Sequence, residues 1–442
     1  MSSPARFAVL CRSPGVRAIG GATLLAAALR AFAAWYWADE VATDVDMYRG
    51  LAANVLAGEG YVSPETGVAT AFRPPLVPLI YAALGDLDWA ILLFQVLAGA
   101  ATAGVTVRLG RALGLTWLGA ALAGVIVACD PVLLRYTPRP MTEITAALLT
   151  ALLLWRIAAG GSWKNAALIG LLFGLSGLCR PTIWAFGGLW TLAWAWDRLR
   201  GRAGWLHGWK RLAAGAAATL LAVSPWVVRN QLVFDRPILM TTHGGYTLHL
   251  ANNEVFYEEV ARGPVGAVWD GRSLLRWQIH YELSYFNWRG LDSPRERRPD
   301  YEVDEDEWRR ELAVDAIQSD PAGFVRAVPL RISRLWSPVP IGPAAEGTPG
   351  PLRWTVGGWN VGVFLLMAWG AVRVWKSDRW TGWRAALLLL ASLTAVHAVY
   401  WSNARMRGAV VPAIAVLAAA GACGVGRETP GPADGTLDES AG

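Results

Sequence analysis

Residues 39–61 read D-E-V-A-T-D-V-D-M-Y-R-G-L-A-A-N-V-L-A-G-E-G-Y, and a Gly/Thr/Ser-rich turn then leads to R-P-P-L-V-P at residues 73–78. Four carboxylates (Asp39, Glu40, Asp44 and Asp46) stand at the start of this stretch, immediately after an apolar segment. Ionised side chains are costly near the hydrocarbon of a membrane, so a cluster at this place indicates a functional site. We therefore expect the chemistry of the chain to depend on this stretch.

A short helix is predicted inside the stretch. From Asp46 to Leu56, apolar side chains recur at helical spacing, which indicates an amphipathic helix lying on the membrane surface, and Gly58 follows as its terminator. Asp44 and Asp46 stand at its start, where the helix dipole favours a carboxylate that stays ionised, as a general base must. The alternative is that either residue only caps the helix, and the stretch alone leaves both roles open.

The composition indicates a polytopic membrane protein. Of 442 residues, 54% are hydrophobic and only 17% are charged, and the chain contains 25 Trp. The net charge of +6 resides in short basic clusters between apolar spans, which is typical of membrane topology and does not indicate a nucleic-acid partner. The four cysteines have neither the spacing of a disulfide framework nor that of a metal site.

Ten apolar stretches predict about ten transmembrane helices, so the expected fold class is an all-α polytopic membrane protein. The basic N-terminal flank places the N-terminus in the cytoplasm. Pro74–Gly85 is too short to cross and is predicted to be a juxtamembrane or re-entrant segment. The stretches are Ile19–Trp37, Trp89–Val107, Leu115–Leu134, Glu143–Trp155 with its extension Ile157–Ala159, Ala166–Leu178, Ile183–Trp196, Leu212–Val228, Trp354–Val374, Trp383–Trp401 and Ala409–Val425.

Four regions follow from these spans. Residues 1–228 form an N-terminal transmembrane module whose first external loop, residues 38–88, carries the candidate site. Residues 229–350 form an extracytoplasmic domain with mixed secondary structure, including a strand before Pro237, a loop at Gly244-Gly245 and a helix over Asp304–Ser319. Residues 351–426 hold the C-terminal spans, and the polar, Pro/Gly-rich residues 427–442 are predicted to be disordered.

Charged residues gather at the predicted outer ends of the spans. Arginine binds phosphate through two parallel hydrogen bonds and a carboxylate can deprotonate a hydroxyl, so the set suits a reaction on a lipid-linked anion. The alternatives are interfacial snorkelling for the arginines and a capping box with Thr142 for the one glutamate. Besides the first-loop carboxylates, the set comprises Arg139, Glu143, Arg180, Arg229, Asn230, Arg405 and Arg407.

Several motifs together resemble the GT-C membrane glycosyltransferases, specifically the bacterial relatives of dolichyl-phosphate-mannose protein mannosyltransferases and of the aminoarabinose transferase that acts on lipid A. The resemblance covers nearly the whole chain and is weakest over Val255–Gly350. Besides the first-loop stretch, the motifs are L-L-R-Y-T-P-R-P-M-T-E at 133–143, G-L-S-G-L-C-R-P-T at 174–182, P-W-V-V-R-N-Q-L-V-F-D-R-P at 225–237, G-G-Y-T-L-H-L-A-N-N at 244–253 and A-R-M-R-G-A-V-V-P at 404–412.

The resemblance implies an inverting transfer of a sugar from a polyprenyl-phosphate donor to an acceptor hydroxyl. The family's first-loop Asp, followed four residues later by an aromatic residue, matches Asp44 and Tyr48. Asp44 is thus the first choice for the general base. Asp46 is the second, because the family's adjacent Asp-Glu pair is replaced by Asp44-Val45-Asp46. Glu143 matches the second-loop acidic residue and is assigned to acceptor positioning or to a metal.

The remaining assignments concern the donor, the substrate and the surroundings. The resemblance implies the bacterial inner (plasma) membrane with an extracytoplasmic active site, membrane lipids as surroundings, and a lipid, glycan or protein acceptor. Some family members use a divalent metal, which is the one candidate cofactor, but the sequence identifies no ligand set. Binding of the donor phosphate is assigned first to Arg405 and Arg407, and second to Arg229 and Arg139. Binding of the substrate is assigned to Tyr48, Arg73 and Asn230.

Two other functions compete with the transferase. A transporter or flippase of a lipid-linked or anionic substrate predicts charges at mid-membrane depth and often repeated halves. Arg30 is the clearest charge inside a span, and the sequence has no internal repeat. A noncatalytic membrane scaffold of the same fold is the third possibility. Charges that gather at the outer ends of the spans favour the enzyme.

Overall fold

The computed structural model describes residues 13–201, 208–263, 299–341, 348–375 and 380–425, with the short pieces 269, 272–273, 276–277, 279–280, 283–284, 345 and 377. Within these ranges the chain is almost entirely helical and forms no strand beyond the isolated bridge between Val62 and Ala69. The all-α fold class is therefore confirmed for the described part. The predicted disordered tail, residues 427–442, lies outside it.

Each of the ten predicted apolar stretches forms helix. Seven helices of the described chain are long and apolar enough to cross a membrane, whereas α8, α9 and α10 have 17 residues each, so the count of ten crossings stays a prediction. The helices are α2 (Pro14–Tyr36), α5 (Asp88–Ala112), α6 (Trp117–Ala128) continued by α7 (Pro131–Arg135), α8 (Glu143–Ala159), α9 (Trp163–Cys179), α10 (Ile183–Leu199), α11 (Trp209–Phe234), α18 (Gly350–Val374), α19 (Trp380–Val399), and η5 (Ala404–Val410) continued by α20 (Val411–Cys423).

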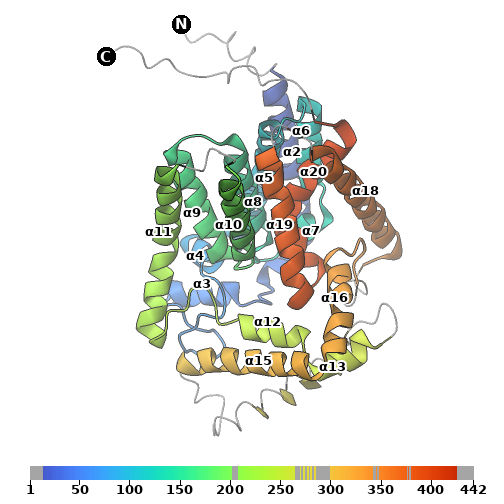
Figure 1. The fold of residues 1–442 in the computed structure, drawn as a ribbon. Helices are drawn as coiled ribbons and strands as arrows, with labels where there is room; N and C mark the ends of the chain where they lie inside the picture. Colours follow the sequence, from blue (N-terminus) through green and yellow to red (C-terminus); the bar gives the residue numbers. More distant parts are fainter. Residues whose placement is uncertain are drawn as a thin grey trace.

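Helix α20 lies inside the bundle, while α11 lies at its edge (Figure 1). Of the apolar window in Ala404–Cys423, 83% is buried, against 11% for α11, so α11 presents its leucines to the lipid. Close packing of α18 on α20 depends on small residues, as is common between membrane helices. A Cβ at Gly370 would come within 1.8 Å of the Leu417 carbonyl oxygen.

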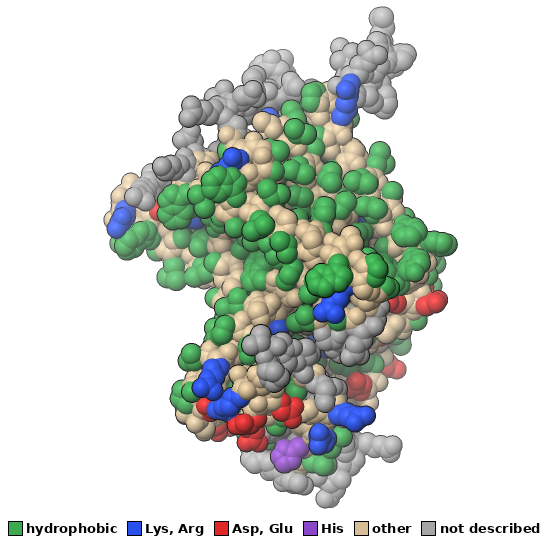
Figure 2. Space-filling model, turned by 90° about the vertical axis from the view of Figure 1, so that its right-hand side faces the viewer, with side chains coloured by type: hydrophobic (Ala, Val, Ile, Leu, Met, Phe, Trp, Pro, Cys, Tyr) green, Lys and Arg blue, Asp and Glu red, His purple; other side chains and the backbone are tan. Residues whose placement is uncertain are grey.

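The polar part of the molecule gathers at one end of the bundle. Figure 2 shows hydrophobic side chains over the upper part of the molecule and acidic side chains concentrated below them, while Lys and Arg occur at both ends. The segment predicted to be too short to cross is indeed an eight-residue helix. This end contains η1 (Ala38–Ala42), α3 (Tyr48–Leu56), α4 (Leu76–Ala83), α12 (Gly244–Ala251), α13 (Glu254–Phe256), η3 (Tyr257–Ala261), α15 (Pro299–Ser319) and α16 (Pro321–Leu335).

Two sequence predictions for residues 229–350 were wrong. The strand expected before Pro237 is the last part of α11, which continues to Phe234. Gly244 and Gly245 begin α12 and do not form a loop. Gly245 allows close packing of α12 on α15: its amide donates to Asp306 Oδ1 at 2.6 Å, and a Cβ there would lie 1.8 Å from the Asp306 carbonyl oxygen.

A buried arginine holds three spans together. Arg30 of α2 is fully buried, and it donates to the carbonyls of Val127 (3.2 Å) and Ala128 (3.3 Å) at the end of α6. These carbonyls belong to the last turn of a helix, where they lack helical partners and carry the negative end of the dipole. Gly99 of α5 makes room for the side chain. Arg30 thus joins α2, α5 and α6.

We expect Gly99→Ala to lower the free energy of unfolding by roughly 1.5–3 kcal/mol, the usual worth of a hydrogen bond to a charged group. The new Cβ would lie 2.0 Å from Arg30 Nε and displace the guanidinium from the α6 carbonyls. Gly21→Ala on α2 is the control, since its Cβ would meet nothing within 4 Å. Thermal unfolding in detergent measures both, and equal transition temperatures would contradict this role of Arg30.

Candidate active site

The first loop uses its two aspartates differently. Helix α3 begins at Tyr48, and Met47 before it has a φ of 62°, in the left-handed region. The two oxygens of Asp44 accept hydrogen bonds from the backbone amides of Arg49 (3.1 Å) and Gly50 (2.8 Å). Asp44 therefore satisfies amides in the first turn of α3, as a capping residue does. The carboxylate of Asp46 takes no part in this capping.

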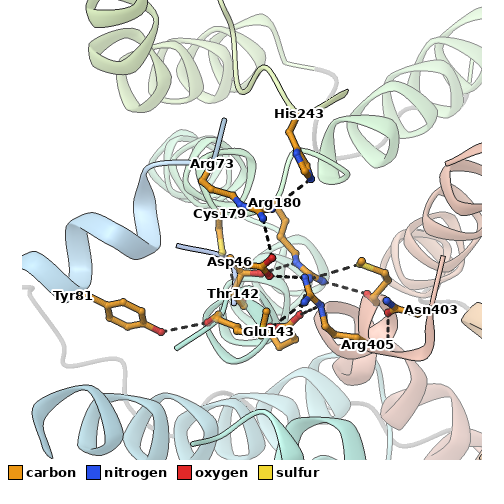
Figure 3. Close-up of polar contacts among 12 residues, drawn as sticks. Asp46, Arg73, Tyr81, Thr142, Glu143, Cys179, Arg180, His243, Asn403 and Arg405 are labelled. Carbon is orange, nitrogen blue, oxygen red and sulfur yellow. Dashed lines mark hydrogen bonds and ion pairs between the residues drawn. The ribbon is translucent and has the colours of Figure 1, made fainter. Parts of the chain in front are cut away.

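Asp46 belongs to a cluster of alternating charges (Figure 3). Its Oδ1 lies 2.8 Å from Nη2 of Arg73, and its Oδ2 lies 3.0 Å from Nη2 of Arg405. Nε of Arg405 lies 2.9 Å from Oε1 of Glu143, and the same oxygen lies 2.7 Å from Nη2 of Arg180. We call these five residues the charged cluster. Its three guanidinium groups and two carboxylates leave one excess positive charge.

Segments far apart in the sequence supply the charged cluster. Glu143 is the first residue of α8, and its side chain is fully buried. The capping box predicted as its alternative role is not formed: Thr142 makes no side-chain cap, and its hydroxyl instead accepts from Arg180 Nε at 2.8 Å. Arg180 follows the last residue of α9, and Arg405 lies in η5, whose first turn Asn403 caps.

Neutral side chains border the cluster at Arg73. Nη1 of Arg73 lies 3.4 Å from Nε2 of His243, and its guanidinium lies over the ring of Tyr48 at 5.9 Å. Burial, helped by the nearby Arg73, holds the pKa of His243 well below its ordinary value, so the imidazole is neutral at pH 7. Burial also raises the pKa of Tyr48 to about 12, which keeps its hydroxyl protonated.

Two arginines expected at the donor phosphate lie outside the cluster. Arg407 is buried, and its Nη1 donates to the carbonyls of Leu335 (3.1 Å) and Ser337 (2.7 Å). Nε of Arg139 donates to Glu40 Oε2 at 2.7 Å, and Arg135 pairs with the same carboxylate. The structure thus gives both side chains partners that belong to the scaffold.

Arg229 and Asn230 likewise bind backbone. Arg229 donates to the carbonyls of Tyr61 and Thr70, each at 2.8 Å, and so fastens the first loop to α11. Asn230 donates to the carbonyl of Ile238 at 2.9 Å and holds the turn after α11. Of the residues assigned to phosphate or substrate, only Arg405, Arg73 and Tyr48 lie at the charged cluster.

Sequence reasoning missed the contribution of α15. Glu302 accepts hydrogen bonds from the Thr70 and Thr242 hydroxyls, each at 2.5 Å, and from the Ala71 amide at 2.7 Å. Burial raises the pKa of this carboxyl. The only signal in the sequence was the density of charge around residue 302, which is typical of any solvated helix, so its contact with a loop 232 residues earlier could not be predicted.

The donor set does not fit a divalent metal. Among the described residues, no group of three or more His, Cys, Asp or Glu is placed to hold a metal ion. The nearest candidates, Asp46 and Glu143, both contact the guanidinium of Arg405, which occupies the space between them. A divalent cation would have to displace this guanidinium before it could bind between the two carboxylates.

The fold is similar to that of the archaeal oligosaccharyltransferase AglB from Archaeoglobus fulgidus, solved with an inhibitory peptide and a dolichol-phosphate. The TM-score is 0.52 at 14% identity, over 91% of this chain and 50% of that one. The chain has a GT-C fold. It spans about half the length of the archaeal protein. ArnT from Cupriavidus metallidurans, solved bound to undecaprenyl phosphate, gives a TM-score of 0.37 at 17% identity, over 85% of this chain and 72% of that one. No protein-family model and no curated protein sequence matches the chain.

We expect Arg407→Leu to destabilise the GT-C fold by about 1–3 kcal/mol, since it leaves the carbonyls of Leu335 and Ser337 buried without their donor. Arg310→Leu is the control, because that side chain is 55% exposed and its partner Asp306 keeps the hydrogen bond from the Gly245 amide. Differential scanning calorimetry of both variants measures the effect. An unchanged unfolding temperature for Arg407→Leu would contradict this structural role and make Arg407 a candidate for phosphate binding again.

Proposed function

We propose that the chain is an integral membrane glycosyltransferase that moves a sugar from a polyprenyl-phosphate donor to an acceptor hydroxyl, with inversion. The charged cluster carries the proposal, because it places an excess positive charge and two carboxylates together at the mouth of apolar helices. The GT-C fold supports it. The mid-span Arg30 is hydrogen-bonded within the scaffold, so no observation favours a transporter as a second function.

Arg180 and Arg405 are proposed to bind the donor phosphate. Both guanidinium groups contact Glu143, whose Oε2 has no hydrogen-bond partner among the described residues. Guanidinium groups bind phosphate oxygens through parallel hydrogen bonds, and they stabilise the negative charge that grows on the leaving oxygen. Because Glu143 holds both arginines in place before the donor arrives, little reorganisation is needed in the transition state.

Asp46 is proposed as the general base in preference to Asp44. The oxygens of Asp44 are engaged by two backbone amides, whereas Oδ2 of Asp46 lies against Arg405. Phosphate competes with Asp46 for Arg405, so donor binding releases Oδ2 for the acceptor hydroxyl. The acceptor oxygen then attacks the anomeric carbon, its proton passes to Asp46, and the bond from that carbon to the phosphate oxygen breaks. Attack from the face opposite the phosphate inverts the configuration.

The charged cluster is proposed to face the extracytoplasmic side of a bacterial inner membrane. The first loop, which carries Asp46, meets the start of α5 through the ion pair of Arg49 with Asp88, while Arg108 and Arg111 lie at the other end of that helix. Basic residues are concentrated on the cytoplasmic side of membrane proteins.

In intact cells, Glu65→Cys should react with a membrane-impermeant maleimide, and Lys164→Cys should react only after permeabilisation. The reverse pattern would place the cluster in the cytoplasm.

We expect Asp46→Asn to lower turnover about 10²–10⁴-fold, the usual contribution of a general base. Transfer from radiolabelled polyprenyl-phosphate hexoses into membrane acceptors measures it in the purified, reconstituted full chain. Asp44→Asn is the matched control and should cost less, since its role is to cap α3. Arg405→Gln should instead weaken binding of sugar-free polyprenyl phosphate, which Asp46→Asn should retain.

Two results would contradict this assignment. Near-normal turnover of Asp46→Asn with an inactive Asp44→Asn would exchange the roles of the two aspartates. Full activity of both would remove the first loop from the chemistry. Failure of the wild-type chain to bind polyprenyl phosphate, or to transfer any hexose from it, would count against the transferase itself and leave the noncatalytic scaffold.

A further inference from the structure

A second polar site adjoins the charged cluster on the side away from the spans. A cavity of about 180 Å³ lies between the first loop and α15, and its lining comprises first-loop residues including 63–66 and 68–70, with Arg73, and Tyr246 and Arg309 on the other side. The volume is several times the ~30 Å³ that a water molecule occupies in the liquid. It is large enough for a ring-sized group.

Buried donors without partners line this cavity. Arg309 is 4% exposed and gives Nε and Nη2 to Glu305, but its Nη1 has no hydrogen-bond partner among the described residues. Nε of Arg73 is likewise buried without a partner there. A buried guanidinium donor that makes no hydrogen bond is destabilising, so oxygen atoms of a ligand would complete both groups.

Acceptors and rings line the same space. Glu302 and Asp306 contribute carboxylates, and Phe72 and Tyr246 contribute rings. His243 packs between the two rings, with centroids 4.3 Å from Phe72 and 5.1 Å from Tyr246. The cationic groups Arg73 and Arg309 are already paired with Asp46 and Glu305. The lining therefore offers donors, acceptors and apolar faces without an excess of positive charge, which suits a neutral polyhydroxyl ring better than an anion.

The position of the cavity separates the two substrates. Arg73 lines it and contacts Asp46 at 2.8 Å, so a bound group lies one side chain away from the proposed base. On the other side of the charged cluster, a smaller cavity is lined by Arg180 together with apolar residues of α8, α10 and α19. The membrane-embedded donor would approach through the spans, and the first-loop cavity is left to the acceptor.

We propose that the first-loop cavity binds a sugar ring of the acceptor, with Arg309 and Arg73 donating to its hydroxyl groups and Phe72 and Tyr246 packing beside it. The acceptor is then a glycan or glycolipid, and a neighbouring hydroxyl of the bound ring is presented to Asp46. This assignment rests on the proposed transferase function.

The test measures binding of methyl glycosides of mannose, glucose, galactose and N-acetylglucosamine to the full chain in detergent, by saturation-transfer NMR. At least one should bind the wild type, and Arg309→Lys should weaken it about tenfold, because lysine keeps the charge but loses the fork of donors. Arg310→Lys is the matched control on the same helix, since Arg310 is not part of the lining. Phe72→Leu, which removes a ring but no charge, should also weaken binding.

The outcomes separate the subsite from the proposed function. No glycoside binding to the wild type, or equal binding by Arg309→Lys and Arg310→Lys variants with unchanged thermal unfolding, overturns the subsite. Displacement of the glycoside by polyprenyl-phosphate mannose but not by sugar-free polyprenyl phosphate assigns the cavity to the donor sugar and overturns the acceptor. Binding of sugar-free polyprenyl phosphate to the wild type is measured separately from glycoside binding. Absence of that binding counts against the transferase function.

Discussion

The guanidinium of Arg405 is the contact on which the site depends. It touches Asp46 on one side and Glu143 on the other, at 3.0 and 2.9 Å. In doing so it connects the first loop, the start of α8 and the segment before α20, which are otherwise separate parts of the chain. Removing one partner of a buried ion pair is strongly destabilising, because the remaining charge is left without compensation. The geometry of the charged cluster and the stability of this end of the bundle therefore both depend on the contacts of Arg405.

The composition of the cluster also limits what can bind. Carboxylates at Asp46 and Glu143 neutralise most of the charge of three arginines, so the empty cluster can exist in a partly buried place. An anion adds the missing negative charge and displaces only Oδ2 of Asp46 from Arg405. A divalent cation would add to the positive charge and would have to displace Arg405. The arrangement thus discriminates by charge before any group on the substrate is recognised.

Much of the fold could be predicted because apolar stretches have one stable form in lipid. With no water to satisfy the backbone, such a stretch becomes a helix, and all ten did. The predictions failed where the rule does not apply. The stretch before Pro237 contains Val227, Val228, Val233 and Phe234, which favour a strand, but it continues α11. Gly244-Gly245 suggests a loop because the contact of Gly245 with Asp306 lies far away in sequence.

The site was predictable in part for the same reason. First-loop aspartates, Glu143 and Arg405 stood out as charges beside apolar spans. The sequence predicts the helix from Asp46, whereas α3 begins two residues later, at Tyr48, after Met47 in the left-handed region. This later start leaves Asp44 to accept from the amides of the first turn and leaves Asp46 outside the capping. Arg407 ranked with Arg405 as a phosphate ligand in the sequence, and Arg229 ranked after them, yet both bind carbonyls. Charge at a span end indicates the membrane interface, whereas only the fold decides which arginine joins the charged cluster.

The hydrogen bonds from the first loop to Glu302 have a consequence for biosynthesis. The loop is made early. Glu302, whose carboxylate accepts hydrogen bonds from Thr70 and Ala71, is added more than two hundred residues later, and Arg405 is added later still. Synthesis proceeds at about 5–20 residues per second, so the loop waits at the membrane surface for tens of seconds with its polar groups unpaired. A nascent chain that has inserted its first spans therefore lacks the charged cluster, which is completed only when the segment before the last span has been made.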